Sequence, residues 1–185
     1  MRKLKKTAQV HRGFTLVELL VVIAIIAILA AVVVLIINPL ELTRRGRDAA
    51  RFTDLANLQQ AINVAVQEAT ASSATILCTG TSAPCSGSTN TGARSANGSG
   101  WVKVDLSAQN SVSVPTLPVD PTNSTTYHYT YCSDGNGWEI DTNLESAQQT
   151  TPPNDKRAND GGNDTALYEV GSNLSLIAAS GGCTY

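Results

Sequence analysis

The sequence contains one uninterrupted apolar block, residues 14–37, in which 22 of 24 residues are apolar and only Thr15 and Glu18 are polar. A helix of this length rises about 36 Å, which exceeds the hydrocarbon thickness of about 30 Å of a typical bilayer. The block therefore predicts a membrane-spanning helix. It also takes these residues out of any soluble core, so the rest of the 185-residue chain can support only one modest domain.

The charges of the chain are divided by this block. The 13 residues before it carry 5 basic side chains and no acid, whereas the rest of the chain contains 8 basic and 15 acidic residues. By the positive-inside rule, this asymmetry places the leader in the cytoplasm and the body outside. The acidic body gives no electrostatic basis for general nucleic-acid binding, and we identify no specific nucleic-acid site. The basic residues of the leader are Arg2, Lys3, Lys5, Lys6 and Arg12.

Three interpretations of the apolar block differ in what happens to it in the cell. A secretory signal peptide has an apolar region of about 7–15 residues, which is shorter than this one. A permanent anchor explains length and orientation but leaves Glu18 unexplained, because a carboxylate in a membrane helix costs about 2–3 kcal/mol and is usually paired. Taken alone, Glu18 also fits an interfacial first-turn residue stabilised by the helix dipole. The third interpretation depends on the residues around Glu18.

A basic leader ends in Gly13, Phe14 follows it, Glu18 lies four residues further on, and the helix then continues without a break in its apolar sequence. This arrangement resembles the class III signal of type IV pilins and of the pseudopilins of type II secretion. The resemblance implies cleavage between Gly13 and Phe14 by prepilin peptidase, usually with N-methylation of the Phe14 amine. It also implies that Glu18 pairs with the Phe14 amine of a neighbouring subunit, which offsets two charges buried among apolar helices.

The resemblance also implies a fold, an α+β type IV pilin-like roll in which a long N-terminal helix packs on a small antiparallel sheet. We expect Pro39 to kink this helix without ending it, because the residues beyond it are amphipathic. The expected segments are a leader (1–13), a transmembrane and polymerisation half of the helix (14–37), its amphipathic half (38–71), a Ser/Thr/Gly-rich loop (72–100) and a β-sheet head (101–185).

The segment that follows the helix is rich in loop-forming residues, with 19 of the 29 residues in 72–100 being Ser, Thr, Gly or Asn. After it, alternating apolar and polar residues predict strands. The expected strands are 101–106, 126–132, 138–144 and 166–177, and the second and third form a hairpin within 126–145.

Two further patterns concern the polar part of the chain. We interpret the arginine cluster from Arg44 to Arg51 as a face turned to solvent or to lipid headgroups. The proline-rich segment 115–123 resembles the Pro-Asp-Pro connection that precedes the sheet in the major pseudopilins of type II secretion. Its prolines predict a stiff path, because they fix their own backbone and restrict the residue before them.

Four cysteines allow three disulfide connectivities, among which the sequence does not choose. Export of the body favours oxidation, and Cys78 and Cys85 are close enough in the chain to close a small ring, the alternative being two free thiols. If they pair, Cys132 and Cys183 remain for each other. Such a bridge resembles the C-terminal disulfide loop of many pilins.

An acidic loop, residues 154–164, combines carboxylates and amides with glycines. Oxygen ligands of this kind suit Ca²⁺, and the stretch loosely resembles the calcium loop of major pseudopilins. The expected ligands are Asp155, Asp160 and Asp164, assisted by Asn163 or a backbone carbonyl. The alternative is a turn-rich solvated loop without a metal.

The sequence contains no nucleophile elbow, P-loop or dinucleotide-binding motif, and His128 belongs to no recognisable triad, so we do not expect an enzyme. The resemblance implies a structural subunit that is processed by prepilin peptidase, recruited to an assembly platform in the inner membrane, and polymerised with copies of itself. It begins as a single-pass membrane protein and ends in a cell-surface filament. Two alternatives remain: a pseudopilin in a periplasmic fibre, and a permanently anchored extracellular binding domain that never assembles.

Overall fold

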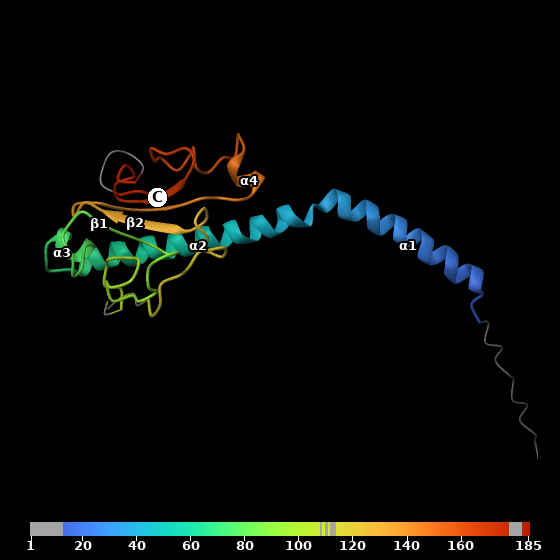
Figure 1. Ribbon diagram of the computed structural model, residues 1–185, viewed down its shortest axis with the longest axis horizontal. Helices are drawn as coiled ribbons and strands as arrows, with labels where there is room; N and C mark the ends of the chain where they lie inside the picture. Colours follow the sequence, from blue (N-terminus) through green and yellow to red (C-terminus); the bar gives the residue numbers. More distant parts are fainter. Residues whose placement is uncertain (1–12, 108, 110, 112–113, 178–182) are drawn as a thin grey trace, which may run out of the picture. The chain divides into compact units, whose positions relative to one another are not determined.

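The structure, a computed structural model, describes residues 13–107, 109, 111, 114–177 and 183–185, with the side chain of Leu35 left out (Figure 1). Of the expected leader, only Gly13 lies within the described residues. The chain divides into two compact units, Met1–Pro39 and Leu40–Tyr185, which we describe separately.

The first unit consists of helix α1, Leu16–Ile37, which begins after the N-cap residue Thr15. All of its described side chains are exposed. Within it, Leu16–Val34 has a mean hydropathy of 3.2 and is long and apolar enough to cross a membrane. The helix ends at Asn38, which has a left-handed backbone with φ of 44°. Asparagine tolerates this conformation, and the following Pro39 disfavours a helical backbone at Asn38.

The second unit, the head, is organised around helix α2, Pro39–Glu68. One face of α2 is buried, as the amphipathic pattern predicted. The single helix expected over residues 14–71 is thus interrupted at Asn38, and α2 ends three residues before the expected boundary. A short helix, α3 (Ser73–Leu77), follows it. The buried apolar residues of α2 are Leu55, Leu58, Ala61, Ile62 and Ala65.

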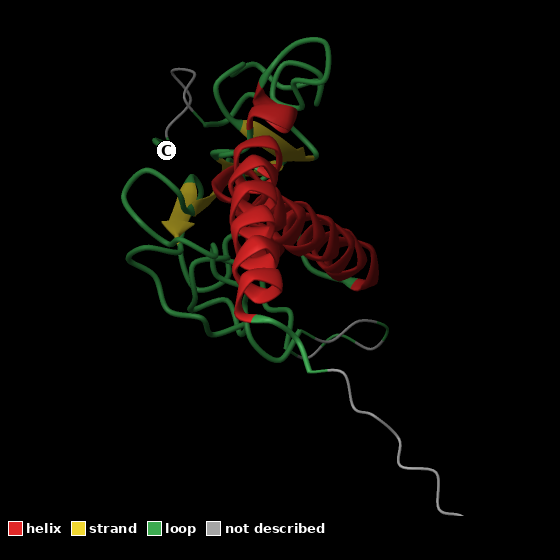
Figure 2. Cartoon of the chain, turned by 90° about the vertical axis from the view of Figure 1, so that its right-hand side faces the viewer, coloured by secondary structure: helices red, strands yellow, loops and turns green. Residues whose placement is uncertain are grey.

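A four-stranded antiparallel sheet in the order β1-β2-β3-β4 completes the head, and the α+β fold class is confirmed. Figure 2 shows how much of the head around these strands is loop. A single turn of helix, α4 (Ala147–Thr150), lies between β3 and β4. The strands are β1 (Cys85–Ser88), β2 (Tyr129–Ser133), β3 (Trp138–Thr142) and β4 (Tyr168–Gly171).

The two faces of the sheet differ because side chains alternate along each strand. One face joins α2 in the main hydrophobic core, whereas the other is covered by the C-terminal part of the chain (Figure 1). Tyr129, Tyr131, Trp138, Ile140 and Val170 belong to the main core. The opposite face carries Thr130, Cys132, Glu139, Asp141 and Glu169, all of them buried.

One predicted strand is absent, and one strand of the sheet was not predicted. Residues 101–106 form no strand, although Trp101, Val102, Val104 and Leu106 are fully buried, because their apolar side chains fill the core without a neighbouring strand to pair with. In their place, β1 occupies the edge of the sheet inside the expected loop 72–100. The sequence Cys-Ser-Gly-Ser of β1 lacks the β-branched and aromatic residues that mark strands.

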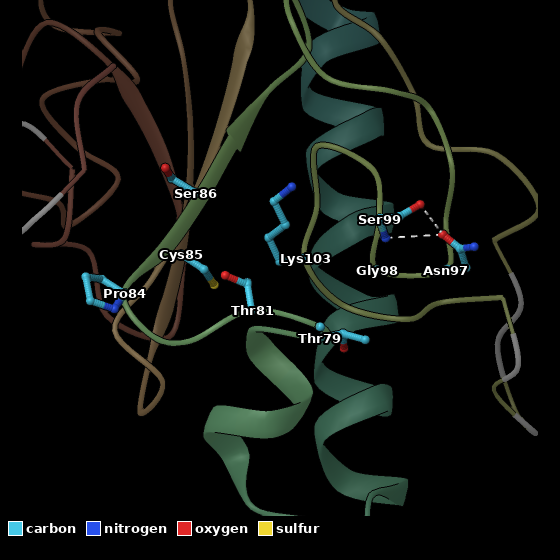
Figure 3. A pocket seen from close by; sticks show the side chains of 10 residues that line it. Thr79, Thr81, Pro84, Cys85, Ser86, Asn97, Gly98, Ser99 and Lys103 are labelled. Atoms are coloured by element: carbon cyan, nitrogen blue, oxygen red, sulfur yellow. Dashed lines mark hydrogen bonds between the residues drawn. The ribbon is translucent and has the colours of Figure 1, made fainter.

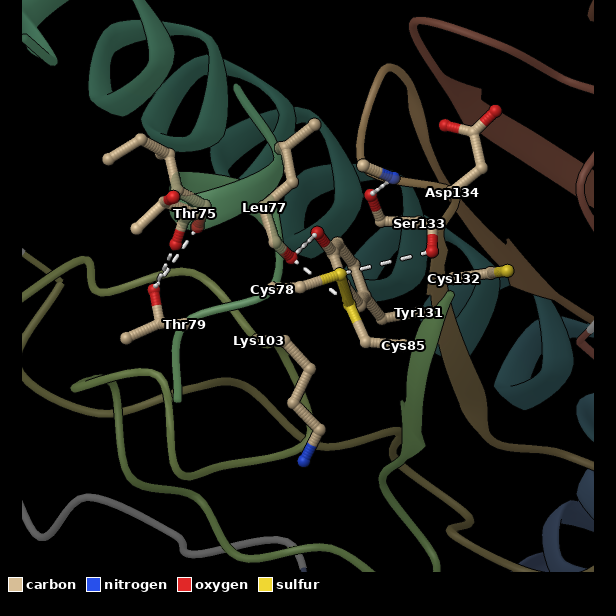
Figure 4. Close-up of a disulfide and its surroundings, with 12 residues drawn as sticks. Thr75, Leu77, Cys78, Thr79, Cys85, Lys103, Tyr131, Cys132, Ser133 and Asp134 are labelled. Carbon is tan, nitrogen blue, oxygen red and sulfur yellow. Dashed lines mark hydrogen bonds between the residues drawn. A yellow bond between two sulfur atoms is a disulfide. The ribbon is translucent and has the colours of Figure 1, made fainter. Parts of the chain in front are cut away.

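Long-range packing accounts for β1. A Cβ atom added to Gly87 would lie 2.4 Å from the carbonyl oxygen of Trp101, so only glycine allows this close approach. The disulfide between Cys78 and Cys85 joins the end of α3 to the start of β1 (Figure 4). Beside it, the hydroxyl of Tyr131 donates a hydrogen bond of 2.7 Å to the carbonyl of Leu77.

The second disulfide pairs Cys132 with Cys183 and joins the C-terminal residues to β2. It belongs to a small cluster with Leu176 and Ile177, against which Tyr185 packs. Of the three possible connectivities, the structure therefore contains Cys78–Cys85 together with Cys132–Cys183.

The contact between α2 and the sheet predicts that Leu58→Ala strongly lowers the stability of the head. Leu58 is 1% exposed, and the truncation leaves a cavity, so we expect the free energy of unfolding to fall by about 2–5 kcal/mol. Urea unfolding of the detergent-solubilised chain, followed by the fluorescence of the buried Trp101 and Trp138, measures this change. Leu42→Ala, at a position on the same helix that is 60% exposed, is the matched control and should change stability by less than about 0.5 kcal/mol.

Candidate functional site

The processing segment at the start of α1 has a defined geometry. The hydroxyl of Thr15 accepts a hydrogen bond from the amide of Glu18 at 3.2 Å, and the Glu18 carboxylate accepts one from the amide of Thr15 at 2.8 Å. This reciprocal pair is a capping box, which satisfies amide groups that the helix leaves free at its first turn. Gly13 precedes it in open space, with nothing within 4 Å of an added Cβ.

This geometry gives Glu18 a local role while the chain is a single unassembled copy. Its charge lies in the first helical turn, where the backbone amides and the helix dipole favour an anion. Cleavage before Phe14 would create an amine on the residue next to Thr15 and therefore close to this carboxylate. The segment thus places Gly13, Phe14 and Glu18 together at one exposed end of an apolar helix.

A buried ionic network centred on Arg51 holds the head together. The Arg51 side chain is fully buried and donates hydrogen bonds to Asp48 at 2.8 Å, to Asp120 at 2.6 and 3.0 Å, and to Glu145 at 2.7 Å. Three carboxylates around one guanidinium use its planar set of donors in several directions. The network ties α2 to the proline-rich connection and to the chain that leaves β3.

Two carboxylates of this network also accept hydrogen bonds from backbone amides. Asp48 accepts the amides of Glu145 at 3.0 Å and of Ser146 at 2.8 Å, and Asp120 accepts the amides of Thr122 and Asn123 at 2.8 and 3.0 Å. These bonds fix the path of the proline-rich connection and of the chain that follows β3. Asp120 lies in the segment that resembled the Pro-Asp-Pro connection, so its place in the network gives that segment a structural role.

The interpretation of the arginine cluster as a solvated or lipid-facing surface was wrong for half of its members. Arg51 is buried, and Arg47 forms a two-point ion pair with Glu145. Arg44 is half-buried and Arg45 is exposed, and both pair with Glu41. Arg47, and then Arg51, lower the pKa of Glu145 to about 2. The sequence analysis missed this network, and the one local signal for it is the spacing of Asp48 and Arg51, which lie one helical turn apart.

Asp155, Asp160 and Asp164, the carboxylates expected to bind calcium, do not form a group of ligand oxygens within 4.8 Å of one another. Asp155 forms an ion pair of 2.9 Å with Arg157. Asp160 accepts the amides of Gly162 and Glu169, at 3.0 and 2.9 Å. Asp164 accepts the amide of Ala166 at 2.8 Å.

A different acidic cluster forms on the sheet, and sequence reasoning missed it. Glu139 and Asp141 on β3 and Glu169 on β4 have ligand oxygens within 4.8 Å of one another, the one such group in the described part of the chain. They are 0%, 0% and 2% exposed. Burial and the neighbouring Glu139 carboxylate raise the pKa values of Asp141 and Glu169. The signal was Glu-x-Asp in a predicted strand, but the contact with Glu169 depends on the pairing of β3 with β4.

A surface cavity of about 530 Å³ lies between β1 and the loop before Lys103 (Figure 3). Lys103 is the one ionisable side chain among its lining residues apart from the disulfide-bonded Cys85, and it donates a 2.8 Å hydrogen bond to the carbonyl of Gly100. The cavity therefore presents no acid–base pair. His128 is buried and stacks on Tyr185 with ring centroids 4.3 Å apart.

Comparison with known proteins agrees with the geometry of the N-terminal segment. Residues 9–34 match the family model of the prokaryotic N-terminal methylation motif, the class III signal of type IV pilins and pseudopilins. The match includes Gly13, Phe14 and Glu18 and most of α1. No curated protein and no solved structure matches the chain. The motif supports processing of this chain as a prepilin-like protein, and α1 is long and apolar enough to serve as its membrane anchor.

The buried network predicts that Arg51→Ala is strongly destabilising. The substitution leaves three carboxylates without their shared cation, and breaking a buried ion pair costs about 3–5 kcal/mol. Arg45→Ala is the matched control, because the Arg45 side chain is 48% exposed and surface ion pairs contribute about 0–1 kcal/mol. Urea unfolding at pH 7 measures both. Equal effects of the two substitutions would contradict the structural role of Arg51.

The lowered pKa of Glu145 predicts a loss of stability in acid. The pKa of Glu145 is about 2 in the folded head and about 4.3 in an unfolded chain, so its contribution is present above about pH 4.5 and is lost as the pH falls toward 2. Glu145→Gln should flatten the decline in unfolding free energy over this window, whereas Glu41→Gln should leave it unchanged. Urea unfolding at pH 7, 4 and 3 tests the expectation, and an equally steep decline in Glu145→Gln would refute it.

Proposed function

We propose that this protein is a structural subunit, a type IV pilin or pilin-like protein, that polymerises through α1 into a filament after processing by prepilin peptidase. The observation that carries the proposal is the methylation motif at residues 9–34, placed at the start of a helix whose described side chains are all exposed. A helix with this surface needs an apolar environment from outside its own chain. A bilayer provides it before assembly, and α1 helices of other subunits provide it in the filament.

Glu18 is the residue whose role differs between assembly into a filament and simple anchoring in the membrane. Apolar helices gain little hydrophobic free energy by leaving lipid for one another, so packing and polar pairs decide how they associate. A carboxylate on an apolar helix is such a polar group. Once cleavage has freed the Phe14 amine, Glu18 of one subunit and Phe14 of the next can form an ion pair among the helices. Each added subunit brings the amine or the carboxylate that its neighbour needs.

The head supports this function by being rigid and suited to an oxidising compartment. Two disulfides, together with the Arg51 network, hold its long loops in place. Such a head tolerates exposure on a cell-surface filament, where the protein is no longer a membrane-anchored precursor. Helix α1, which precedes the head, is the part of the chain through which the protein engages the assembly platform and further copies of itself.

A pseudopilin of a type II secretion system is the second candidate. It is favoured by the proline-rich connection at 115–123, whose Asp120 is held by Arg51. The processing and helix chemistry of the two candidates are the same, and they differ in the length and location of the fibre. A permanently anchored binding domain would share the helix but not the need for Glu18.

Assembly of Glu18 variants tests the proposal. In cells that express prepilin peptidase and a cognate assembly system, we expect the chain in sheared surface fibres or in a periplasmic pseudopilus. Glu18→Ala should insert into the membrane normally, but its fibre yield should fall more than about tenfold, the change that 1.4 kcal/mol produces. Glu41→Ala, the same change outside the apolar block, should assemble normally.

Two outcomes would count against the proposal. A normal fibre yield from Glu18→Ala would remove Glu18 from assembly. A wild-type chain that stays in the membrane and enters no fibre, although its leader is removed, would favour the anchored binding domain. Quantitative immunoblotting of membrane and sheared fractions distinguishes these results.

A further inference from the structure

The acidic cluster lies on the sheet face opposite the main core, and this face is also buried. Three carboxylates together are an unusual arrangement for a protein interior. Asp141 on β3 lies directly opposite Glu169 on β4, and Glu139 lies two residues before Asp141 on the same face. Like charges in opposed positions of neighbouring strands are destabilising. Burial increases the repulsion, because water cannot screen it.

The described residues donate hydrogen bonds to only some of the carboxylate oxygens of this cluster. The amides of Leu176 and Ile177 donate to one oxygen of Glu139, at 2.7 and 2.8 Å, and the amide of Asp164 donates to one oxygen of Glu169 at 3.1 Å. Four other oxygens are buried without a hydrogen-bond partner among the described residues: Oε1 of Glu139, both carboxylate oxygens of Asp141, and Oε1 of Glu169. Buried polar atoms are normally paired, so these four require an explanation.

We propose that Glu139, Asp141 and Glu169 bind one divalent cation, and that this cation is Ca²⁺. A divalent ion offsets most of the negative charge of three carboxylates and occupies the oxygens that no donor reaches. The ligand set consists only of carboxylate oxygens, which suits hard cations, and Ca²⁺ accepts six to eight oxygens in flexible geometry. This site lies on β3 and β4, and not on the loop residues 155–164 that the sequence suggested.

The acidic loop acts as a cover for this site. A Cβ atom added to Gly162 would lie 1.7 Å from Oε2 of Glu169, so the loop backbone passes directly over the cluster. Asp160 accepts the amide of Glu169 at 2.9 Å and holds the loop to the start of β4. Leu176 and Ile177 close the site from the C-terminal side through Glu139. A bound cation would therefore tie β3, β4, the loop and the C-terminal segment together, independently of filament assembly.

Calcium titration of the full chain in detergent tests the site. The protein is stripped with EDTA, titrated with CaCl₂ by isothermal calorimetry, and heated with and without CaCl₂ while tryptophan fluorescence is recorded. We expect one saturable site and a rise in Tm with calcium. Loss of groups that only orient metal ligands lowers affinity about 10–100-fold, so Asp141→Asn, which removes a ligand, should lower it by more than about 100-fold and abolish the rise in Tm.

Asp155→Asn is the matched control, because Asp155 lies in the acidic loop but pairs with Arg157. It should retain the wild-type calcium affinity within about threefold, since it leaves the sheet carboxylates untouched. Asn has the shape of a protonated Asp, so Asp141→Asn should fold in EDTA with a Tm at least as high as that of the wild type. Glu169→Gln provides a second variant with the same expected loss of binding if Asp141→Asn does not fold.

Three results would overturn the proposal. The first is the absence of saturable calcium binding in the wild-type chain, with the same Tm in EDTA and in CaCl₂. The second is calcium binding that survives in both Asp141→Asn and Glu169→Gln. The third is a loss of binding in Asp155→Asn with normal binding in the sheet variants, which would place the cation on the loop instead.

Discussion

The exposed apolar surface of α1 is the constraint on which the rest of the molecule depends. Leu16–Ile37 buries none of its described side chains within its own chain, so lipid or other helices must cover it. Both environments are apolar, and the hydrophobic effect alone scarcely distinguishes them. A single carboxylate at the start of the helix therefore has a large influence, because it is the group for which the two environments differ. The capping box with Thr15 satisfies Glu18 in the single chain, and in the proposed filament the amine of a neighbouring subunit would pair with it.

The head solves a separate problem, which is to remain folded with a small apolar core and long loops. Its main core lies between α2 and one face of the sheet. Beyond that core, much of the structure is organised by polar groups. Arg51 gathers carboxylates from three segments of the head, and the pairing of β3 with β4 places three further carboxylates together on the sheet. The two arrangements differ in chemistry: the first contains its own cation, Arg51, whereas the second contains only carboxylates and is the site at which we propose that a cation binds.

The sequence predicted those features that depend on local pattern. The apolar helix, the amphipathic face of α2, the hairpin β2-β3 and the α+β class follow from periodicity within short windows. The methylation motif follows from a few residues at fixed spacing. Features created by long-range contact were not predicted. Strand β1 depends on Gly87 meeting Trp101, the burial of Arg51 depends on Asp120 far along the chain, and the acidic cluster depends on the register of Asp141 with Glu169.

Mass spectrometry of the N-terminal peptide is the most direct test of how this chain functions. The full chain is produced together with an active prepilin peptidase, and, as a control, with a catalytically inactive peptidase. We expect the active enzyme to yield a chain of 172 residues that begins at Phe14 with a methylated amine, and the inactive enzyme to leave the 13-residue leader in place. A chain that keeps its leader in both cases, or that begins at a residue other than Phe14, would contradict the prepilin mechanism.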